Sequence, residues 1–381
     1  MSTNGKLPWR SGQTSLLALD WAKAFDSVHV GRLIQCLQRF GVSGVTLKAI
    51  SSLMRDRKFF VEDGGCKSTL RQQRSGISQG CTLSPLLFIT VMSAVMHDAV
   101  AMLSPPARAA YDRGDLADVV FADDTLLVGA NSKFVTEFIR VVAAAGRAIG
   151  LELHEDKFQL LQVRCHADVL NASSDKITAS PSMCYLGANL AADGRVGSEL
   201  SRRIGAAKGD FRSLCQVWRH SALTTAHKLK VFRTLVESRL LYALCTGCYT
   251  KAELRRLDGF QAKCLRTILR ILPSHLSRIS NAAVRERAGW KCASRLLLAR
   301  QLFFLGKVIR STPDSLLSAV SFIPGTLQPA TSRFIRRVGR PRKEWISEVL
   351  PHAFLLAGGE ANLRTAVQNQ LQWKLTVRAS V

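Results

Sequence analysis

The sequence predicts an α/β domain over roughly the first half of the chain and an all-α region over the second half. In the first half, short apolar runs typical of strands alternate with segments whose apolar residues recur at helical spacing. After about residue 198 the strand-like runs stop, and long helical patterns rich in Lys and Arg begin. At 381 residues and 47% hydrophobic, the chain is long enough for two or three domains with cores of their own.

The first half opens with the segment TSLLALDW, which contains a strand-like run that ends at Asp20. The elements expected next, in order, are helices over 30–40 and 45–54, a hairpin near 62–65, and a long buried helix that starts close to Pro85. The composition of residues 104–117 predicts a loop. A helix over 132–149 and a strand over 158–163 complete the alternating pattern.

Two adjacent aspartates, Asp123 and Asp124, interrupt two apolar strand-like runs and predict the tip of a β-hairpin. Like charges so close together resist joint ionisation unless a cation neutralises them. Asp20 also ends a strand, so a sheet that places the two strands side by side would gather three hard oxygen ligands, which suit magnesium. Taken alone, however, an acidic hairpin tip is usually only a solvated turn.

Positive charge is concentrated in the second half of the chain. Residues 191–381 hold 33 Lys and Arg against 11 Asp and Glu, whereas residues 1–190 hold 20 against 17. A formal charge of +22 on one half attracts polyanions, so nucleic acid is the first partner to consider and an anionic membrane surface the second. A solvated face on an ordinary helical bundle is the alternative reading.

No signal peptide and no uninterrupted apolar run of about 18 or more residues is evident, so we expect an intracellular protein without a membrane partner. The ten cysteines are scattered, and Cys245 and Cys248 have no second pair with zinc-ligand spacing. We interpret the cysteines as reduced core thiols.

Five segments, in order, resemble the motifs of the reverse transcriptase family. These are LALDWAKAFDSV, SGISQGCTLSPLLF, FADD, LELHEDKFQLL and the Tyr185-Leu186-Gly187 triplet. The residues of these motifs are most similar to those of non-long-terminal-repeat (LINE-type) retrotransposons. A group II intron maturase is a lesser alternative. The resemblance implies a palm with a four-stranded antiparallel sheet over 1–190, a helical basic thumb over 191–290 and a basic C-terminal region over 291–381.

The resemblance also implies roles for single residues. Asp20, Asp123 and Asp124 would be the catalytic metal ligands for two Mg²⁺ or Mn²⁺ ions, together with the backbone carbonyl of Trp21. Lys157 would act as general acid on the departing pyrophosphate, against the alternative of a solvated surface charge. Four residues would contact the incoming deoxynucleoside triphosphate, and three would grip the primer: Phe25, Gln79, Gly80 and Phe121 for the nucleotide, and Tyr185, Leu186 and Gly187 for the primer.

Among these residues, Phe25 would exclude a 2′-hydroxyl by contact, and its alternative reading is a plain core aromatic. The partners implied are an RNA template and a DNA primer, held by phosphate contacts that carry no sequence information. Residues 336–345, RRVGRPRKEW, leave both a nucleic-acid contact and a nuclear import signal open.

The sequence departs from the family in one major respect. Only 19 residues precede Asp20, where the family has a fingers region of about 100 or more residues that grips the triphosphate by electrostatic clamping. We therefore expect an N-terminally truncated copy or a late start, and Thr82 stands where Pro is usual. Two hypotheses follow: an RNA-directed DNA polymerase, and a catalytically inactive remnant that binds nucleic acid.

Overall fold

The computed structural model describes residues 13–312, 315–330 and 343–380. Contacts between residues divide the chain into two compact units, unit 1 over Met1–Leu186 and unit 2 over Gly187–Val381. Most of the basic segment expected at 336–345 lies outside the described residues.

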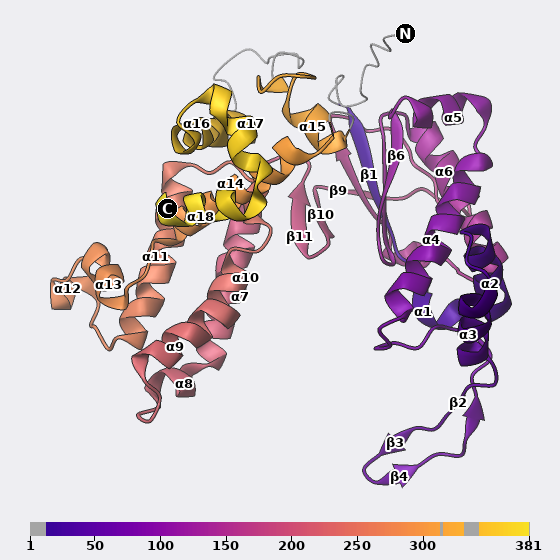
Figure 1. Cartoon of the computed structure of the whole chain (residues 1–381), viewed down its shortest axis with the longest axis horizontal. Helices are drawn as coiled ribbons and strands as arrows, with labels where there is room; N and C mark the ends of the chain where they lie inside the picture. Colours follow the sequence, from indigo (N-terminus) through magenta and orange to yellow (C-terminus); the bar gives the residue numbers. More distant parts are fainter. Residues whose placement is uncertain (1–12, 313–314, 331–342, 381) are drawn as a thin grey trace. The chain divides into compact units, whose positions relative to one another are not determined.

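A five-stranded sheet forms the centre of unit 1, in the order β6-β7-β1-β8-β9 (Figure 1). Its strands are β1 Thr14–Leu19, β6 Leu116–Phe121, β7 Asp124–Gly129, β8 Gln159–Val163 and β9 Ala179–Ser180. The first four are antiparallel neighbours, as predicted. The predicted four-stranded antiparallel core is present, and the sheet has one strand more, because two further residues pair beside β8 as the short parallel strand β9.

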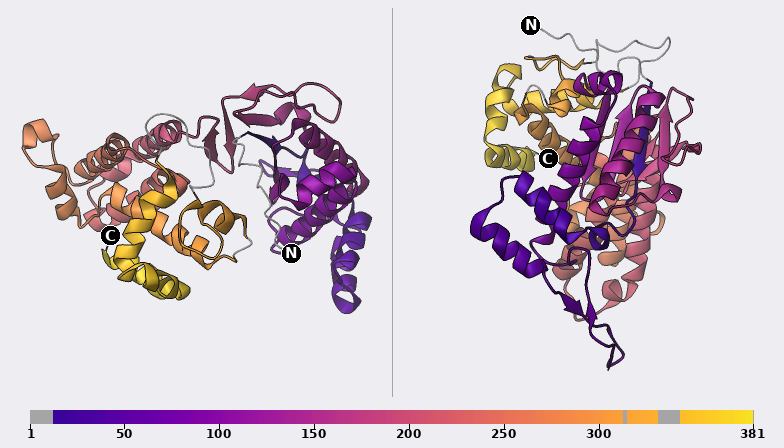
Figure 2. Two further views of the ribbon diagram at one scale, coloured as in Figure 1. Left: turned by 90° about the horizontal axis from the view of Figure 1, so that it is seen from above. Right: turned by 90° about the vertical axis from the view of Figure 1, so that its right-hand side faces the viewer.

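Two long helices, α4 Ser84–Ala101 and α6 Ser132–Ile149, pack side by side against one face of this sheet (Figures 1 and 2). Alternate β1 side chains such as Leu17 and Leu19 are buried beneath the helices, as the period of a strand requires. Among the described residues, only α4 is long and apolar enough to cross a membrane, and 56% of its length is buried in this core.

Between β1 and α4, the helices α2 and α3 and the hairpin of β3 and β4 were predicted, whereas α1 and the outer strands β2 and β5 were not. These elements are α1 Ala24–Ser27, α2 Val30–Arg39, α3 Gly44–Met54, and a ribbon of β2 Lys58–Phe59, β3 Glu62–Asp63, β4 Cys66–Lys67 and β5 Arg71–Gln72. Gly41, with φ of 81°, follows the last turn of α2 in the left-handed conformation that ends many helices. The ribbon projects away from the sheet (Figure 1 and right panel of Figure 2).

The loop expected at 104–117 is wrong, since α5 spans Pro105–Asp112. Two prolines occupy its first turn, where their missing N–H groups cost nothing. Alanines with high helix propensity follow, and Arg108 pairs with Asp112 one turn later. Ser104, just before α5, is fixed by Glu137, whose carboxylate accepts from its backbone N–H and its hydroxyl. The prolines and the glycine of this segment led to the prediction of a loop, although the two prolines form the first turn of the helix.

The ten cysteines are all free, as expected, but the expectation of core thiols is wrong for most of them. Only Cys36 and Cys264 are buried, whereas four are exposed: Cys66, Cys81, Cys184 and Cys215. Cysteine is among the most often buried residue types, and that general tendency misled the sequence analysis.

Helices make up most of unit 2. Its elements are β11 Ala188–Ala191, α7 Gly197–Ser213, α8 Cys215–Arg219, α9 Thr225–Val231, the π-helix η3 Phe232–Glu237, α10 Ser238–Leu240, η4 Leu244–Thr246, α11 Lys251–Ile268, α12 Ser274–Ser277, α13 Asn281–Ala288, α14 Ala293–Arg310, α15 Leu316–Ser321, α16 Trp345–Ala357, α17 Glu360–Gln368 and α18 Gln370–Ser380. Their apolar faces form two clusters. One is built on α7 to α13 and the start of α14, and the other on the rest of α14, on Phe322 and Leu327, and on α16 to α18. The predicted all-α character of this half is confirmed.

Candidate active site

Asp20 and Asp124 lie opposite each other at the end of the sheet. In the antiparallel register of β1 and β7, Leu19 pairs with Thr125. Asp20, the residue after Leu19, is therefore level with Asp124, the residue before Thr125. Trp21, which is buried, fixes this end of the strands because its Nε1 donates to Thr125 Oγ1 at 3.2 Å. The antiparallel pairing of two distant segments thus brings together carboxylates that the sequence analysis had linked only by assumption.

Asp123 occupies the tight turn between β6 and β7. Phe121 pairs with Asp124, which leaves Ala122 and Asp123 as a two-residue hairpin turn. Ala122 has φ of 54°, in the left-handed region that costs a residue with a Cβ roughly 1–2 kcal/mol. The paired strands hold this strained turn in place, and such strain is typical of functional sites.

The three carboxylates influence one another electrostatically. The pKa of Asp124 is raised, first by partial burial of its carboxyl group and then by the negative charges of Asp123 and Asp20. Hard carboxylate oxygens in mutual repulsion have the chemistry that a divalent cation requires. In the described part of the chain, however, no three acidic, His or Cys side chains stand in a ready metal-binding arrangement.

Lys157 supplies a positive charge at this site. It ends the short 3-10 helix η2 Glu155–Lys157, and its Nζ lies 3.1 Å from Asp20 Oδ2. The backbone N–H of His154 donates to the Asp20 carbonyl at 2.8 Å and so anchors η2 beside the end of β1. Both side chains are largely exposed, so the pair adds little to stability, but it neutralises one of the three carboxylates.

Phe25 lies one turn beyond Asp20, in α1, and is half-buried. Its ring stacks on Phe88 of α4, with centroids 4.3 Å apart and planes inclined by 16°. Phe25 therefore packs on the core through one face of its ring and remains partly exposed. Both predictions, a core aromatic and a nucleotide contact, are compatible with this position.

Gln79 and Gly80 are exposed on the turn that leads into α4. Gly80 has φ of 86°, and a Cβ there would meet open space, so the backbone conformation alone explains the glycine. Gly76 positions this turn: a Cβ on Gly76 would lie 2.8 Å from the backbone of Asp26. The next residue, Ile77, donates its N–H to the Phe25 carbonyl at 2.6 Å.

Two glycines that the sequence analysis missed therefore shape the site. Gly76 brings the Gln79-Gly80 turn against the Phe25 segment. Gly146 of α6 leaves room for the ring of Trp21, which would lie 2.5 Å from an added Cβ. A glycine inside an otherwise regular helix pattern was the signal that could have identified Gly146.

The Tyr185-Leu186-Gly187 triplet spans the boundary between the units. Tyr185 ends β10 Ser182–Tyr185 in unit 1, and its hydroxyl donates to the Val119 carbonyl at 3.2 Å. Burial and then the charge of Asp124 raise the pKa of this phenol, which places the ring close to the acidic cluster. Phe121, by contrast, is 63% exposed at the hairpin tip.

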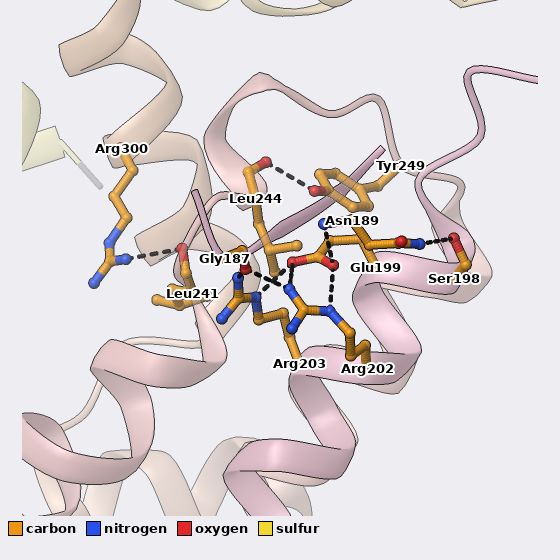
Figure 3. Close-up of polar contacts among 10 residues, drawn as sticks. All are labelled: Gly187, Asn189, Ser198, Glu199, Arg202, Arg203, Leu241, Leu244, Tyr249 and Arg300. Carbon is orange, nitrogen blue, oxygen red and sulfur yellow. Dashed lines mark hydrogen bonds and ion pairs between the residues drawn. The ribbon is translucent and has the colours of Figure 1, made fainter. Parts of the chain in front are cut away.

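In unit 2, the Gly187 carbonyl is held by two arginines of α7 (Figure 3). Nη2 of Arg202 and Nη2 of Arg203 both donate to it, and both side chains also donate to the buried carboxylate of Glu199. These bonds, with one from the Asn189 N–H, hold the pKa of Glu199 below its usual value despite its burial. Gly187 thus starts unit 2 from a fixed backbone position.

Comparison with known proteins finds relatives of this part of the chain. Residues 6–190 match the family model described as reverse transcriptase (RNA-dependent DNA polymerase). A retrovirus-related Pol polyprotein from type-1 retrotransposable element R2 of Popillia japonica is 26% identical over 268 residues, 69% of this chain and 37% of that protein. The RNA-directed DNA polymerase from mobile element jockey of Drosophila funebris is 25% identical over 276 residues, 66% of this chain and 28% of that protein.

The chain thus spans well under half the length of these two curated relatives. Among solved structures, apo telomerase from Candida tropicalis is similar with a TM-score of 0.38 and 12% identity, covering 82% of this chain and 52% of that one.

Proposed function

Because this chain belongs to the reverse transcriptase family through residues 6–190, we propose that it is an RNA-directed DNA polymerase of the non-LTR retrotransposon type. The observation that carries the proposal is the register of β1 and β7, which brings Asp20 level with Asp124 beside the strained turn at Asp123. Three carboxylates at one sheet end match the roles that the five motifs imply for them.

The chemistry proposed is nucleotidyl transfer onto the 3′-hydroxyl of a primer. Asp20, Asp123 and Asp124, with the Trp21 carbonyl, would hold two Mg²⁺ ions. When bound, such ions activate the attacking hydroxyl and neutralise charge on the leaving pyrophosphate. The residues supply the right donor chemistry, and the pKa of Asp124 is raised first by burial and then by the negative charges of Asp123 and Asp20, which bound cations would balance.

The other residues of the site would position the reactants and move a proton. Lys157, held beside Asp20, would donate a proton to the departing pyrophosphate as general acid. Phe25, supported from below by Phe88, would keep a ribose 2′-hydroxyl out of the sugar site. Tyr185, Leu186 and Gly187 would hold the primer end, and Gln79, Gly80 and Phe121 would border the nucleotide.

An RNA template and a DNA primer are the proposed macromolecular partners. Unit 2 carries 33 Lys and Arg against 11 Asp and Glu, a charge of +22 that would hold the phosphates of a duplex without reading its sequence. This charge supports binding of nucleic acid in general, and the acidic site of unit 1 supports the chemistry.

Primer extension on an RNA template with Mg²⁺ and deoxynucleotides tests the proposal. The chain is compared with the Asp123→Asn, Asp124→Asn variant, in which both side chains keep nearly the same shape. We expect incorporation by the parent chain only, with equal or tighter duplex binding by the variant because two negative charges are gone. Equal incorporation by both proteins would refute the assignment of the acidic site.

A binding protein without polymerase activity is the second candidate. It is favoured by the charge of +22 on unit 2, which would bind phosphates whether or not the acidic site of unit 1 is active. If neither protein incorporates nucleotides while both bind the duplex with the same salt dependence, this second function is the correct one.

A further inference from the structure

The ribbon over residues 55–74 carries all the net positive charge of unit 1. It holds six Lys and Arg against three Asp and Glu, while the remaining residues of unit 1 hold 14 of each. Five of the six basic residues are exposed, and the sixth, Arg57, is half-buried. The three acidic residues, Asp56, Glu62 and Asp63, are exposed as well. Unit 1 thus presents its excess charge on one projecting element (Figure 1).

The same ribbon exposes four large apolar side chains. Phe59, Phe60, Val61 and Leu70 are between 45% and 61% exposed, and the described core of unit 1 includes none of them. All four strands of the ribbon are exposed. Backbone hydrogen bonds hold them together, including those from the Ser68 N–H to the Val61 carbonyl and from the Gln73 N–H to the Arg57 carbonyl. An isolated two-stranded ribbon is only marginally stable and gains from a partner on its exposed face.

Each exposed phenylalanine has a cation beside it. Phe59 pairs directly with Arg71 across the β2–β5 ladder, so their side chains share one face of the ribbon. Lys67 Nζ lies 5.1 Å from the centroid of the Phe60 ring and also 3.6 Å from the Glu62 carboxylate. Phe59 further lines an open hollow of about 410 Å³ with Asp26, Gln72, Gln73, Arg74 and Ser75.

We propose that this ribbon is a binding platform for single-stranded nucleic acid. Aromatic rings interleaved with cations suit a single strand, because unpaired bases stack on the rings while the cations bind the phosphates between them. A duplex hides its bases and would use only the cations. Binding to this platform does not require incorporation of nucleotides.

The anchor at the base of the ribbon connects it to the turn before α4. Arg57 Nη2 donates to the Gly76 carbonyl at 2.5 Å, and its Nη1 donates to Ser78 Oγ at 3.1 Å. A strand lying on the ribbon would therefore bind next to the segment that precedes Gln79 and Gly80. Among single-stranded ligands, this position favours the unpaired stretch of a template over an oligonucleotide unrelated to the proposed polymerase site.

Binding of a fluorescent 20-nucleotide RNA, followed by anisotropy, tests the platform on the full chain. The charge of unit 2 would dominate at low salt, so the comparison is made at about 0.3 M salt, where phosphate contacts contribute least. We expect Phe59→Ala, Phe60→Ala to weaken binding about tenfold or more, because each stacked base is lost with its ring. Val61→Ala, which removes a neighbouring exposed apolar side chain without a ring, is the matched control and should bind like the parent chain.

Two further variants separate stacking from charge. The Phe59→Trp, Phe60→Trp variant keeps aromatic rings at both positions, so it should bind RNA like the parent chain and unlike the double alanine variant. Arg71→Gln should lower the slope of log K against log salt by about 0.7, whereas the phenylalanine variant should leave that slope unchanged. The same oligonucleotide as DNA shows whether the platform distinguishes RNA from DNA, and a duplex of the same length should not respond to the phenylalanine change.

Crosslinking localises the contact. RNA that contains 5-iodouridine should crosslink to peptides covering 58–72, and the double alanine variant should lose these crosslinks while Asp123→Asn, Asp124→Asn keeps them. Crosslinks confined to unit 2, or equal binding by the alanine variant and the Val61→Ala control, would overturn the proposal whatever the polymerase activity proves to be. If the Phe59→Ala, Phe60→Ala variant sediments differently from the parent chain but binds RNA equally well, the ribbon serves self-association and the proposal is overturned.

Discussion

The Lys157 ammonium and the Asp20 carboxylate form an ion pair at 3.1 Å although 137 residues separate them in sequence. Asp20 is also level with Asp124 on the neighbouring strand, so one carboxylate faces both a cation and a second carboxylate. Lys157 therefore lies where it would meet the phosphates of a nucleotide bound at the acidic site.

Replacement of Lys157 by Met should slow incorporation by about 10²-fold or more, because the leaving pyrophosphate loses its proton donor. Lys157→Arg keeps the charge but supplies a poor acid, so it should recover nucleotide affinity without recovering the rate. Single-turnover primer extension separates rate from affinity. Lys133→Met, which removes an exposed lysine from the start of α6, is the control and should be neutral. If Lys157→Arg restores the full rate, Lys157 acts through its charge alone.

Magnesium should stabilise unit 1 against heat by way of the three carboxylates. A ligand at about 100 times its dissociation constant adds about 2.7 kcal/mol to the free energy of unfolding, equivalent to roughly 5 °C or more for a unit of this size. The Asp123→Asn, Asp124→Asn variant should show no such shift, and without magnesium it should be at least as stable as the parent chain because the repulsion is removed. Scanning calorimetry with and without Mg²⁺, at ionic strength matched with NaCl, measures both effects. An equal shift in the two proteins would place the bound ion elsewhere.

Phe25→Val should admit ribonucleotides by opening the space that the ring occupies. We expect the preference for deoxynucleotides to fall by roughly tenfold to a hundredfold, the range that one steric contact supplies. Because Phe25 also stacks on Phe88, the variant should lose about 1–2 kcal/mol of stability as well. Incorporation ratios for paired ribo- and deoxynucleotides give the first effect and urea unfolding the second. Phe25→Tyr keeps the ring and should leave the ratio unchanged, so a relaxed ratio in both variants would contradict the steric explanation.

Sequence patterns predicted the elements of unit 1 well where periodicity is strong. The run predicted to end at Asp20 became β1, which ends one residue earlier at Leu19, and the spacing over 132–149 became α6 at the same bounds. The pattern failed where local composition misleads, as at Pro105–Asp112, and where a strand forms only by tertiary pairing, as at the two-residue β9. The acidic residues were identified from the sequence, but their cross-strand alignment depends on register, which no local pattern encodes.

Contacts made at a distance also escaped prediction. The close approach of Gly146 to Trp21 joins α6 to the strand end, and nothing near either residue announces the other. The bonds from Arg202 and Arg203 to the Gly187 carbonyl are similarly invisible, because basic residues on α7 suggested only a solvated or phosphate-binding face. Motifs identify reacting groups, whereas the residues that support them are known only from the folded chain.

Glu237 offers a test of unit 2 that is independent of catalysis. It ends the π-helix η3, is buried, and its Oε1 accepts from Gln261 Nε2 at 2.8 Å and from Trp290 Nε1 at 2.9 Å. Burial raises the pKa of this carboxyl above 4.5, although both hydrogen bonds and the charges of Arg233 and Arg300 oppose the rise. A group whose pKa is raised on folding contributes stability below its unfolded pKa, and this stability is lost as pH rises through the folded value.

Glu237→Gln should therefore be more stable than the parent chain at pH 7, because Gln keeps the accepting oxygen without the buried charge. The advantage should shrink as pH falls and disappear below about 4.5, the unfolded value, where the parent carboxyl is protonated in both states. Urea unfolding followed by tryptophan fluorescence between pH 4 and 8 measures the difference. Glu286→Gln, an exposed change in α13 of the same unit, should show no comparable pH dependence. If Glu237→Gln is the less stable protein at pH 7, the attraction of Arg233 and Arg300 for the carboxylate outweighs the cost of burying it.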